Sequence, residues 1–71
     1  MRNSIVTYDT NLWRRFHNLA ADATLHAHNG LEVMHIQQVV QAAREGAITI
    51  RDAHGAIATL RRQQNERQRA A

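Results

Sequence analysis

The residues in this sequence that are best suited to bind a charged partner are its arginines, which supply all nine of its basic side chains. A guanidinium group stays charged and binds a phosphate or a carboxylate through two parallel hydrogen bonds. Four arginines follow Leu60, the last large apolar residue: Arg61, Arg62, Arg67 and Arg69. A GC-rich genome explains the absence of lysine, but it does not explain this clustering. The clustering predicts a contact surface near the C-terminal end.

Five histidines raise the question of a metal site: His17, His26, His28, His35 and His54. Two ligands on one helix share a metal when they are three or four residues apart. His26 and His28 are two apart, which directs them to different faces of a helix. We therefore expect surface and helix-end histidines, with no metal and no other cofactor.

The residue types needed for catalysis do not form a recognisable set. The sequence has no cysteine and a single serine, Ser4. Its six acidic residues are scattered over expected helix caps and solvent faces. General acid–base chemistry would instead need paired carboxyl groups in an apolar setting. A glycine-rich phosphate loop is also missing, so we expect a protein that is not an enzyme.

Length and composition describe one small domain with a thin hydrophobic core. A chain of 71 residues is near the size at which one core is only marginally sufficient, and twelve of its apolar residues are alanines. Disulfides are excluded, so we expect association, as a homodimer or on another protein, to supply stability. No apolar run reaches the roughly 20 residues that span a bilayer. The segment from Met1 to Val6 lacks a signal-peptide pattern, so we expect a cytoplasmic protein without membrane contact.

The spacing of apolar residues predicts the first two helices. The first begins after the capping residues Asp9-Thr10-Asn11 and ends near Asn29-Gly30, a good left-handed terminator. The second runs from Leu31 to Glu45 and stops at Gly46. Its apolar residues spread over about half of the helix circumference, which is typical of a central helix between two neighbours.

A third helix is predicted after Thr49, whose hydroxyl can cap it, with Asp52 in a capping-box position. The spacing Gly46-x-Ile48-Thr49-x-x-Asp52 resembles the Gly-x-Ile-Thr-x-x-acidic hairpin of the bacterial SHOCT module. The resemblance covers about a third of the chain and implies no functional residue.

These elements predict an all-α fold, either a small three-helix bundle or a helical hairpin plus a projecting C-terminal helix, associated as a dimer. We divide the chain into an N-terminal arm at 1–8, a helical body at 9–60 and an arginine-rich C-terminal helix extension at 61–71. The segment from Ser4 to Tyr8 is rich in β-branched residues and could form a short strand. Beyond Leu60 every face is polar, so we expect the third helix to project from the body.

The function that we expect is that of a non-catalytic interaction or regulatory protein that binds an acidic protein partner. Its size and basic charge would suit a phage or plasmid regulator. The predicted contacts are apolar residues at the edge of their stripes or outside them, together with arginines. They are Trp13, Leu25, Met34, Arg14, Arg15, Arg61, Arg62, Arg67 and Arg69.

The alternative is a small nucleic-acid-binding regulator. A formal net charge of +3 and a pI near 11.1 also suit phosphate binding. Ala42-x-x-x-Gly46 resembles the turn of a helix-turn-helix motif, although the residues after Gly46 are shifted by one position. The contact residues of this alternative are Arg51, Arg61, Arg62, Arg67 and Arg69.

Overall fold

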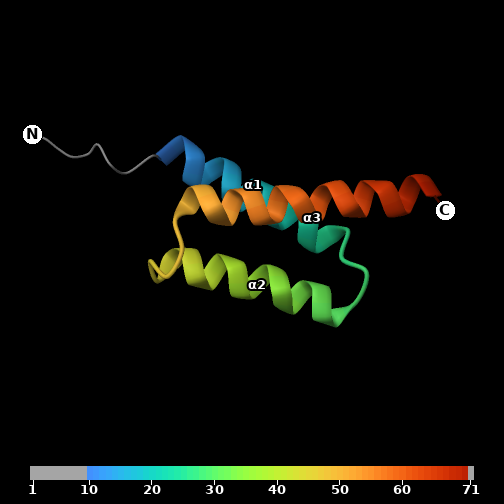
Figure 1. The fold of residues 1–71 in the computed structure, drawn as a ribbon, viewed down its shortest axis with the longest axis horizontal. Coiled ribbons are helices and arrows are strands. Elements are labelled where there is room, and N and C mark those ends of the chain that lie inside the picture. Colours follow the sequence, from blue (N-terminus) through green and yellow to red (C-terminus); the bar gives the residue numbers. More distant parts are fainter. Residues whose placement is uncertain (1–9, 71) are drawn as a thin grey trace, which may run out of the picture.

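The computed structural model describes residues 10–70 and contains three helices in this part of the chain (Figure 1). They are α1 (Thr10–Leu25), α2 (Gly30–Arg44) and α3 (Ile50–Ala70). No strand occurs among the described residues, so the predicted all-α class is confirmed. The predicted arm at 1–8, with its possible strand, lies outside the described residues.

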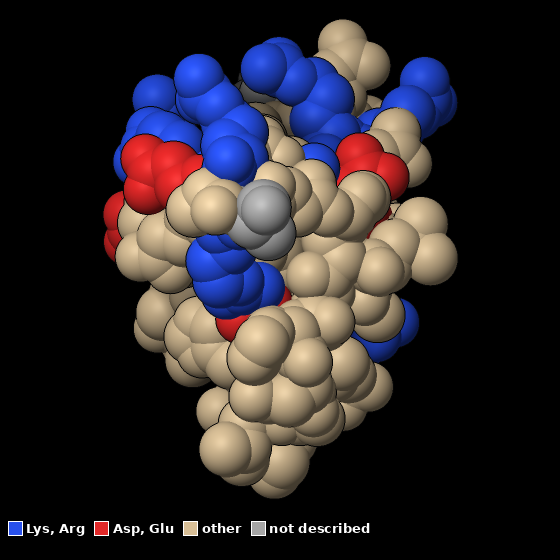
Figure 2. All heavy atoms as spheres, turned by 90° about the vertical axis from the view of Figure 1, so that its right-hand side faces the viewer, with Lys and Arg blue, Asp and Glu red and all other residues tan. Residues whose placement is uncertain are grey.

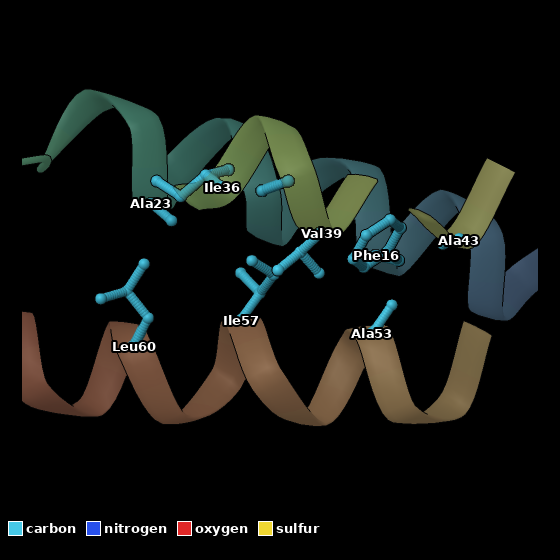
Figure 3. Close-up of a cluster of buried hydrophobic side chains, with 9 residues drawn as sticks. Phe16, Ala23, Ile36, Val39, Ala43, Ala53, Ile57 and Leu60 are labelled. Carbon is cyan, nitrogen blue, oxygen red and sulfur yellow. The ribbon is translucent and has the colours of Figure 1, made fainter. Parts of the chain in front are cut away.

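A single core lies between the three helices, and each helix contacts the other two. α1 and α3 run in the same direction and α2 runs against them (Figure 1). The core side chains come from all three helices (Figure 3). They are Phe16, Ala20, Ala23, Ile36, Val39, Ala43, Ala53, Ile57 and Leu60. Four of these nine are alanines, which let the helices approach closely but leave little apolar volume between them.

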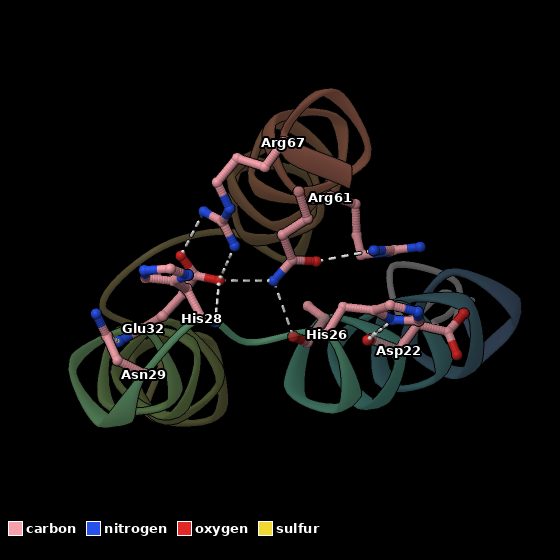
Figure 4. Close-up of polar contacts among 9 residues, drawn as sticks. Asp22, His26, His28, Asn29, Glu32, Arg61 and Arg67 are labelled. Atoms are coloured by element: carbon pink, nitrogen blue, oxygen red, sulfur yellow. Dashed lines mark hydrogen bonds and ion pairs between the residues drawn. The ribbon is translucent and has the colours of Figure 1, made fainter. Parts of the chain in front are cut away.

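The prediction that the second helix is central is wrong. Seen along their axes, the helices stand at the corners of a triangle, so α2 has neighbours on one side only (Figure 4). Its buried residues, Ile36, Val39 and Ala43, form one stripe. The wide apolar surface arises instead because Leu31 and Met34 lie on the solvent side, 75% and 50% exposed.

The first turn also differs from the prediction. α1 ends at Leu25, and Asn29 caps the start of α2 instead of ending α1. The Asn29 side-chain oxygen accepts a hydrogen bond of 3.0 Å from the Glu32 N–H. The Glu32 carboxylate in turn accepts one of 3.0 Å from the His28 N–H. Asn29-x-x-Glu32 is therefore a variant capping box, in which the Glu32 carboxylate accepts from the N–H of His28 instead of that of the capping residue Asn29. The Asn-x-x-Glu pattern is visible in the sequence.

The second turn follows the prediction. Gly46 has a φ of +79°, in the left-handed region that favours glycine. The Thr49 hydroxyl accepts a hydrogen bond of 3.0 Å from the Asp52 N–H, which caps α3.

At Gly55, in contrast to Gly46, the backbone conformation does not require a glycine. It lies inside α3 on the exposed side, where glycine destabilises a helix by about 1 kcal/mol relative to alanine. A Cβ placed on Gly55 would meet no atom within 4 Å. Packing among residues 10–70 therefore does not require a glycine here.

Candidate functional site

A cluster of polar side chains, which we name the polar clamp, joins the α1–α2 turn to the last turns of α3 (Figure 4). It consists of Glu32, Gln64 and Arg67. The Arg67 guanidinium donates two hydrogen bonds to the Glu32 carboxylate, at 3.0 and 2.9 Å. The Gln64 amide donates to the same carboxylate at 2.9 Å and to the Ala23 carbonyl at 3.0 Å. Its oxygen accepts from Arg61 at 2.8 Å.

The clamp changes the interpretation of the arginine-rich C-terminal extension. Gln64 is 1% exposed and continues the buried stripe of Ile57 and Leu60 by one more turn. The amide of Gln64 also satisfies the Ala23 carbonyl, one of the last carbonyls of α1, which lack partners within their own helix. The third helix does extend to Ala70, as predicted, but it is bound to the body as far as Arg67. The expected projection of the helix therefore begins after Arg67 and not directly after Leu60.

Electrostatics within the clamp favour its charged form. Hydrogen bonds from Arg67 and Gln64 lower the pKa of Glu32 to about 2, and the His28 N–H adds to this effect against the opposing effect of burial. The hydrogen bond to Glu32 raises the pKa of Arg67. Each charge of the pair is thus largely satisfied inside the protein, and Arg67 is a poor candidate for contact with a partner.

A groove of about 520 Å³, the α1–α2 groove, runs along the other side of the bundle. The α1 wall is made of small residues, Ala20, Ala21 and Thr24. The α2 wall is made of longer, mostly flexible side chains: Met34, Ile36, Gln37, Gln38, Val40, Gln41 and Arg44. Arg44 is the only charged residue of this lining.

Three large apolar side chains are exposed at the end of the molecule where the α1–α2 groove meets the α1–α2 turn. Leu25, Leu31 and Met34 are 80%, 75% and 50% exposed. Leu25 is four residues after Ala21, and Leu31 is three residues before Met34, so each neighbours a groove residue on its own helix face. At this end of the molecule the lower part of the surface, over α2, is largely uncharged, whereas arginines gather at the top, over α3 (Figure 2).

The predicted partner-binding residues do not form one surface. Leu25 and Met34 lie at the same end of the bundle. Trp13 is half-buried, with its ring 6.1 Å from that of Phe16 and 5.7 Å from that of His17, so it packs against the body. The predicted arginines are exposed on α1 and α3, except for the partly buried Arg61 and the ion-paired Arg67. The exposed ones are Arg14, Arg15, Arg62 and Arg69.

Three of the five arginines predicted for the nucleic-acid alternative form a regular pattern on α3, which we name the α3 arginine stripe. It consists of Arg51, Arg62 and Arg69, all exposed. They are 11 and 7 residues apart, and at 3.6 residues per turn both spacings return to within about 20° of the same direction. Gly55 and Ala58 lie between the first two arginines on the same stripe. Counting the helical phase of each arginine would have revealed this pattern.

The charge of the molecule is concentrated on α3. Five arginines against two acidic residues give this helix a formal charge of +3, equal to that of the whole chain. The three arginines of the stripe span about 27 Å along the axis at 1.5 Å per residue. α2, by contrast, carries one acidic and one basic residue, so it has no formal net charge.

The histidines do not converge. Among residues 10–70, no group of three or more histidines and acidic residues could hold a metal ion. His17 lies against the Trp13 and Phe16 rings, and His26 Nδ1 lies 2.9 Å from the Asp22 carbonyl oxygen. None of the three described helices has the length and apolar character needed to cross a bilayer.

The chain matches no protein-family model, no curated protein and no solved structure. Its function has to be inferred from its residues and their geometry.

Proposed function

We propose that this protein is a non-catalytic interaction module that binds an amphipathic helix of an acidic protein partner in the α1–α2 groove. The observation that carries the proposal is the position of the exposed large apolar residues. Among the described residues these are Leu25, Leu31 and Met34: Met34 lines the groove, and Leu25 and Leu31 are exposed close to the α1–α2 turn, outside the groove lining. Apolar side chains that gather at the surface of a small protein mark interaction sites.

The walls of the α1–α2 groove suit a helix as the ligand. Ala20 and Ala21 on α1 are small enough for a partner backbone to approach closely. On the opposite wall Met34 can adapt its unbranched side chain to irregular apolar surfaces. The glutamines at the rim can donate and accept hydrogen bonds with polar groups that flank the apolar stripe of a helix. A helix bound in this way would place residues at three- and four-residue spacing into the groove.

Charge indicates the type of partner. Arg44 lines the groove, and its guanidinium pairs with none of the described residues. A carboxylate on the bound helix would satisfy it. The formal charge of +3 on the chain would also speed encounter with an acidic protein. Capture of a helix from such a partner would allow the protein to regulate it without catalysis.

Site-specific cross-linking in the native cell tests the proposal. We place the photoreactive residue benzoylphenylalanine at Gln37, which lines the groove, or at Gln63, which is exposed on α3. The expected result is a cross-link to an acidic protein from position 37 only, and a cross-linked peptide that forms an amphipathic helix. Cross-linking of the same protein from both positions would contradict the proposal.

A charge placed in the groove provides a second measurement. Met34→Glu should weaken binding of the identified helix by about tenfold or more, because a carboxylate would have to be desolvated at an apolar contact. Gln63→Glu adds the same charge away from the groove and should leave binding unchanged. Circular dichroism should show equal helix content in both variants.

The homodimer stays a prediction. A second copy of this chain is the competing occupant of the α1–α2 groove. A cross-linked product from position 37 that contains two copies of this chain would replace the acidic partner with self-association. Sedimentation velocity over a range of concentrations would then show a dimer that Met34→Glu dissociates.

A further inference from the structure

The α3 arginine stripe forms a second interaction surface. We propose that it binds the sugar–phosphate backbone of double-stranded nucleic acid without reading the base sequence. Arg51, Arg62 and Arg69 make the phosphate contacts, and Gly55 allows the backbone to lie close to the helix. This surface shares no residue with the α1–α2 groove, so each proposal can fail without the other.

The polar clamp determines which arginines are available. Arg67 gives both ends of its guanidinium to Glu32, and Arg61 donates to the buried Gln64. The three arginines of the stripe are exposed, and the one side-chain bond among them is a 3.4 Å hydrogen bond from Arg62 to the Thr59 hydroxyl. An external anion would therefore meet three guanidinium groups that form no ion pair among the described residues, although the exposed Glu66 is within one helical turn of Arg62 and Arg69.

The residues around the stripe favour a nucleic acid over an acidic protein or a membrane. A protein interface needs large apolar anchors at its centre, and a helix that lies on a membrane needs an apolar face. Among residues 10–70 the exposed large apolar residues are all on α1 and α2, whereas Gly55 and Ala58 occupy the centre of the stripe. A phosphate backbone requires neither feature, since charge alone supplies its affinity.

Gly55 affects how closely the duplex backbone can approach the surface of α3. It weakens α3, and no contact with the described part of the chain requires it. On the stripe it leaves the helix surface bare between Arg51 and Arg62, which are about 16 Å apart along the axis. A duplex backbone can lie in this gap with one arginine on each side. The whole stripe, about 27 Å long, is shorter than one duplex turn of about 34 Å, so all three contacts fit on one side of a duplex.

Fluorescence anisotropy with a labelled duplex of random sequence tests the proposal. Three phosphate contacts predict a slope of about −2.7 for the logarithm of affinity against the logarithm of salt concentration. Affinity should therefore fall about 40-fold when the salt concentration is raised fourfold. A duplex that shows no binding at low salt would overturn the proposal.

Two variants of equal charge separate the stripe from the net charge. Replacing Arg51, Arg62 and Arg69 together with glutamine lowers the formal charge from +3 to zero. Replacing Arg2, Arg14 and Arg15 with glutamine lowers it equally and leaves both the stripe and the groove unchanged. The stripe variant should lose binding and its salt dependence, while the control should keep a slope near that of the original protein. Equal losses in the two variants would mean that only net charge matters, and would overturn the proposal.

A third variant tests the close approach. Gly55→Gln introduces a good helix former without charge, so helix content should be kept or increased. The longer side chain should weaken duplex binding about tenfold by holding the backbone away from Arg51 and Arg62. Unchanged binding would contradict the role of Gly55. Binding to vesicles that contain phosphatidylserine as tightly as to the duplex would contradict the choice of nucleic acid.

Discussion

Glu32 should make the stability of the fold depend on pH in the acid range, and Glu32→Gln should remove this dependence. The substitution keeps the shape of the side chain and an oxygen that can accept from His28 and Arg67, but it removes the charge. Glu32 has its pKa lowered from 4.5 to about 2 in the folded protein. Its ionised form therefore stabilises the fold above about pH 4.5, and this contribution is lost as the pH falls towards 2.

The magnitude follows from the size of this pKa change. A tenfold change in a protonation equilibrium is worth about 1.4 kcal/mol, so the fall from 4.5 to about 2 sets an upper limit of about 3 kcal/mol. The Arg67 side chain is 41% exposed and that of Glu32 is 14% exposed, so water screens part of the attraction. We expect about 1–2 kcal/mol of unfolding free energy to depend on ionised Glu32.

Urea unfolding followed by circular dichroism at several pH values measures this contribution. The original protein should be more stable than Glu32→Gln by about 1–2 kcal/mol near neutral pH, and the difference should shrink towards zero as the pH approaches 2. Glu66→Gln is the matched control, because Glu66 is an exposed carboxylate on α3 outside the clamp. If the original protein and Glu32→Gln lost stability in parallel on acidification, the clamp would not be the source of the acid sensitivity.

Three further substitutions test the fold. Gln64→Leu leaves the Ala23 carbonyl without its partner and should lower the unfolding free energy by about 1–3 kcal/mol, measured in urea; an equally stable variant would show that the buried amide contributes nothing. Gly46→Ala forces a side chain onto a φ of +79° and should cost about 1–2 kcal/mol, whereas Gly30→Ala, where φ is not positive, serves as its control. Phe16→Ala empties the centre of a thin core and should cost about 3–5 kcal/mol, enough to leave much of the chain unfolded at 25 °C by circular dichroism; a folded variant with a cooperative transition would contradict the importance of this ring.

Local signals in the sequence were sufficient for the number of helices and for the second turn. Gly46, Thr49 and Asp52 act on their immediate neighbours, so their effects can be read from spacing alone. The first turn was mispredicted because Asn29 suits the end of one helix as well as the start of the next. The hydrogen bonds between Asn29 and Glu32 decide between these roles, and the spacing of the two residues contained that signal.

The burial of Gln64 could not be predicted in the same way. A glutamine in a polar, arginine-rich segment has the composition of a solvated helix end. Its burial depends on the Ala23 carbonyl and the Glu32 carboxylate, which are 41 and 32 positions away in the chain. The same tertiary contacts engage Arg61 and Arg67 and leave Arg51, Arg62 and Arg69 exposed. Grouping the arginines by nearness in sequence therefore selected a different set from the one that shares a helix face.

The polar clamp has a consequence for the kinetics of folding. Its hydrogen bonds join residues 32 to 41 positions apart, so none of them can form before α3 has docked on α1 or on α2. We expect these bonds to be absent from the transition state for folding. Substitutions in the clamp should then leave the refolding rate almost unchanged and accelerate unfolding. The clamp would thus set the lifetime of the folded protein rather than the speed at which it forms.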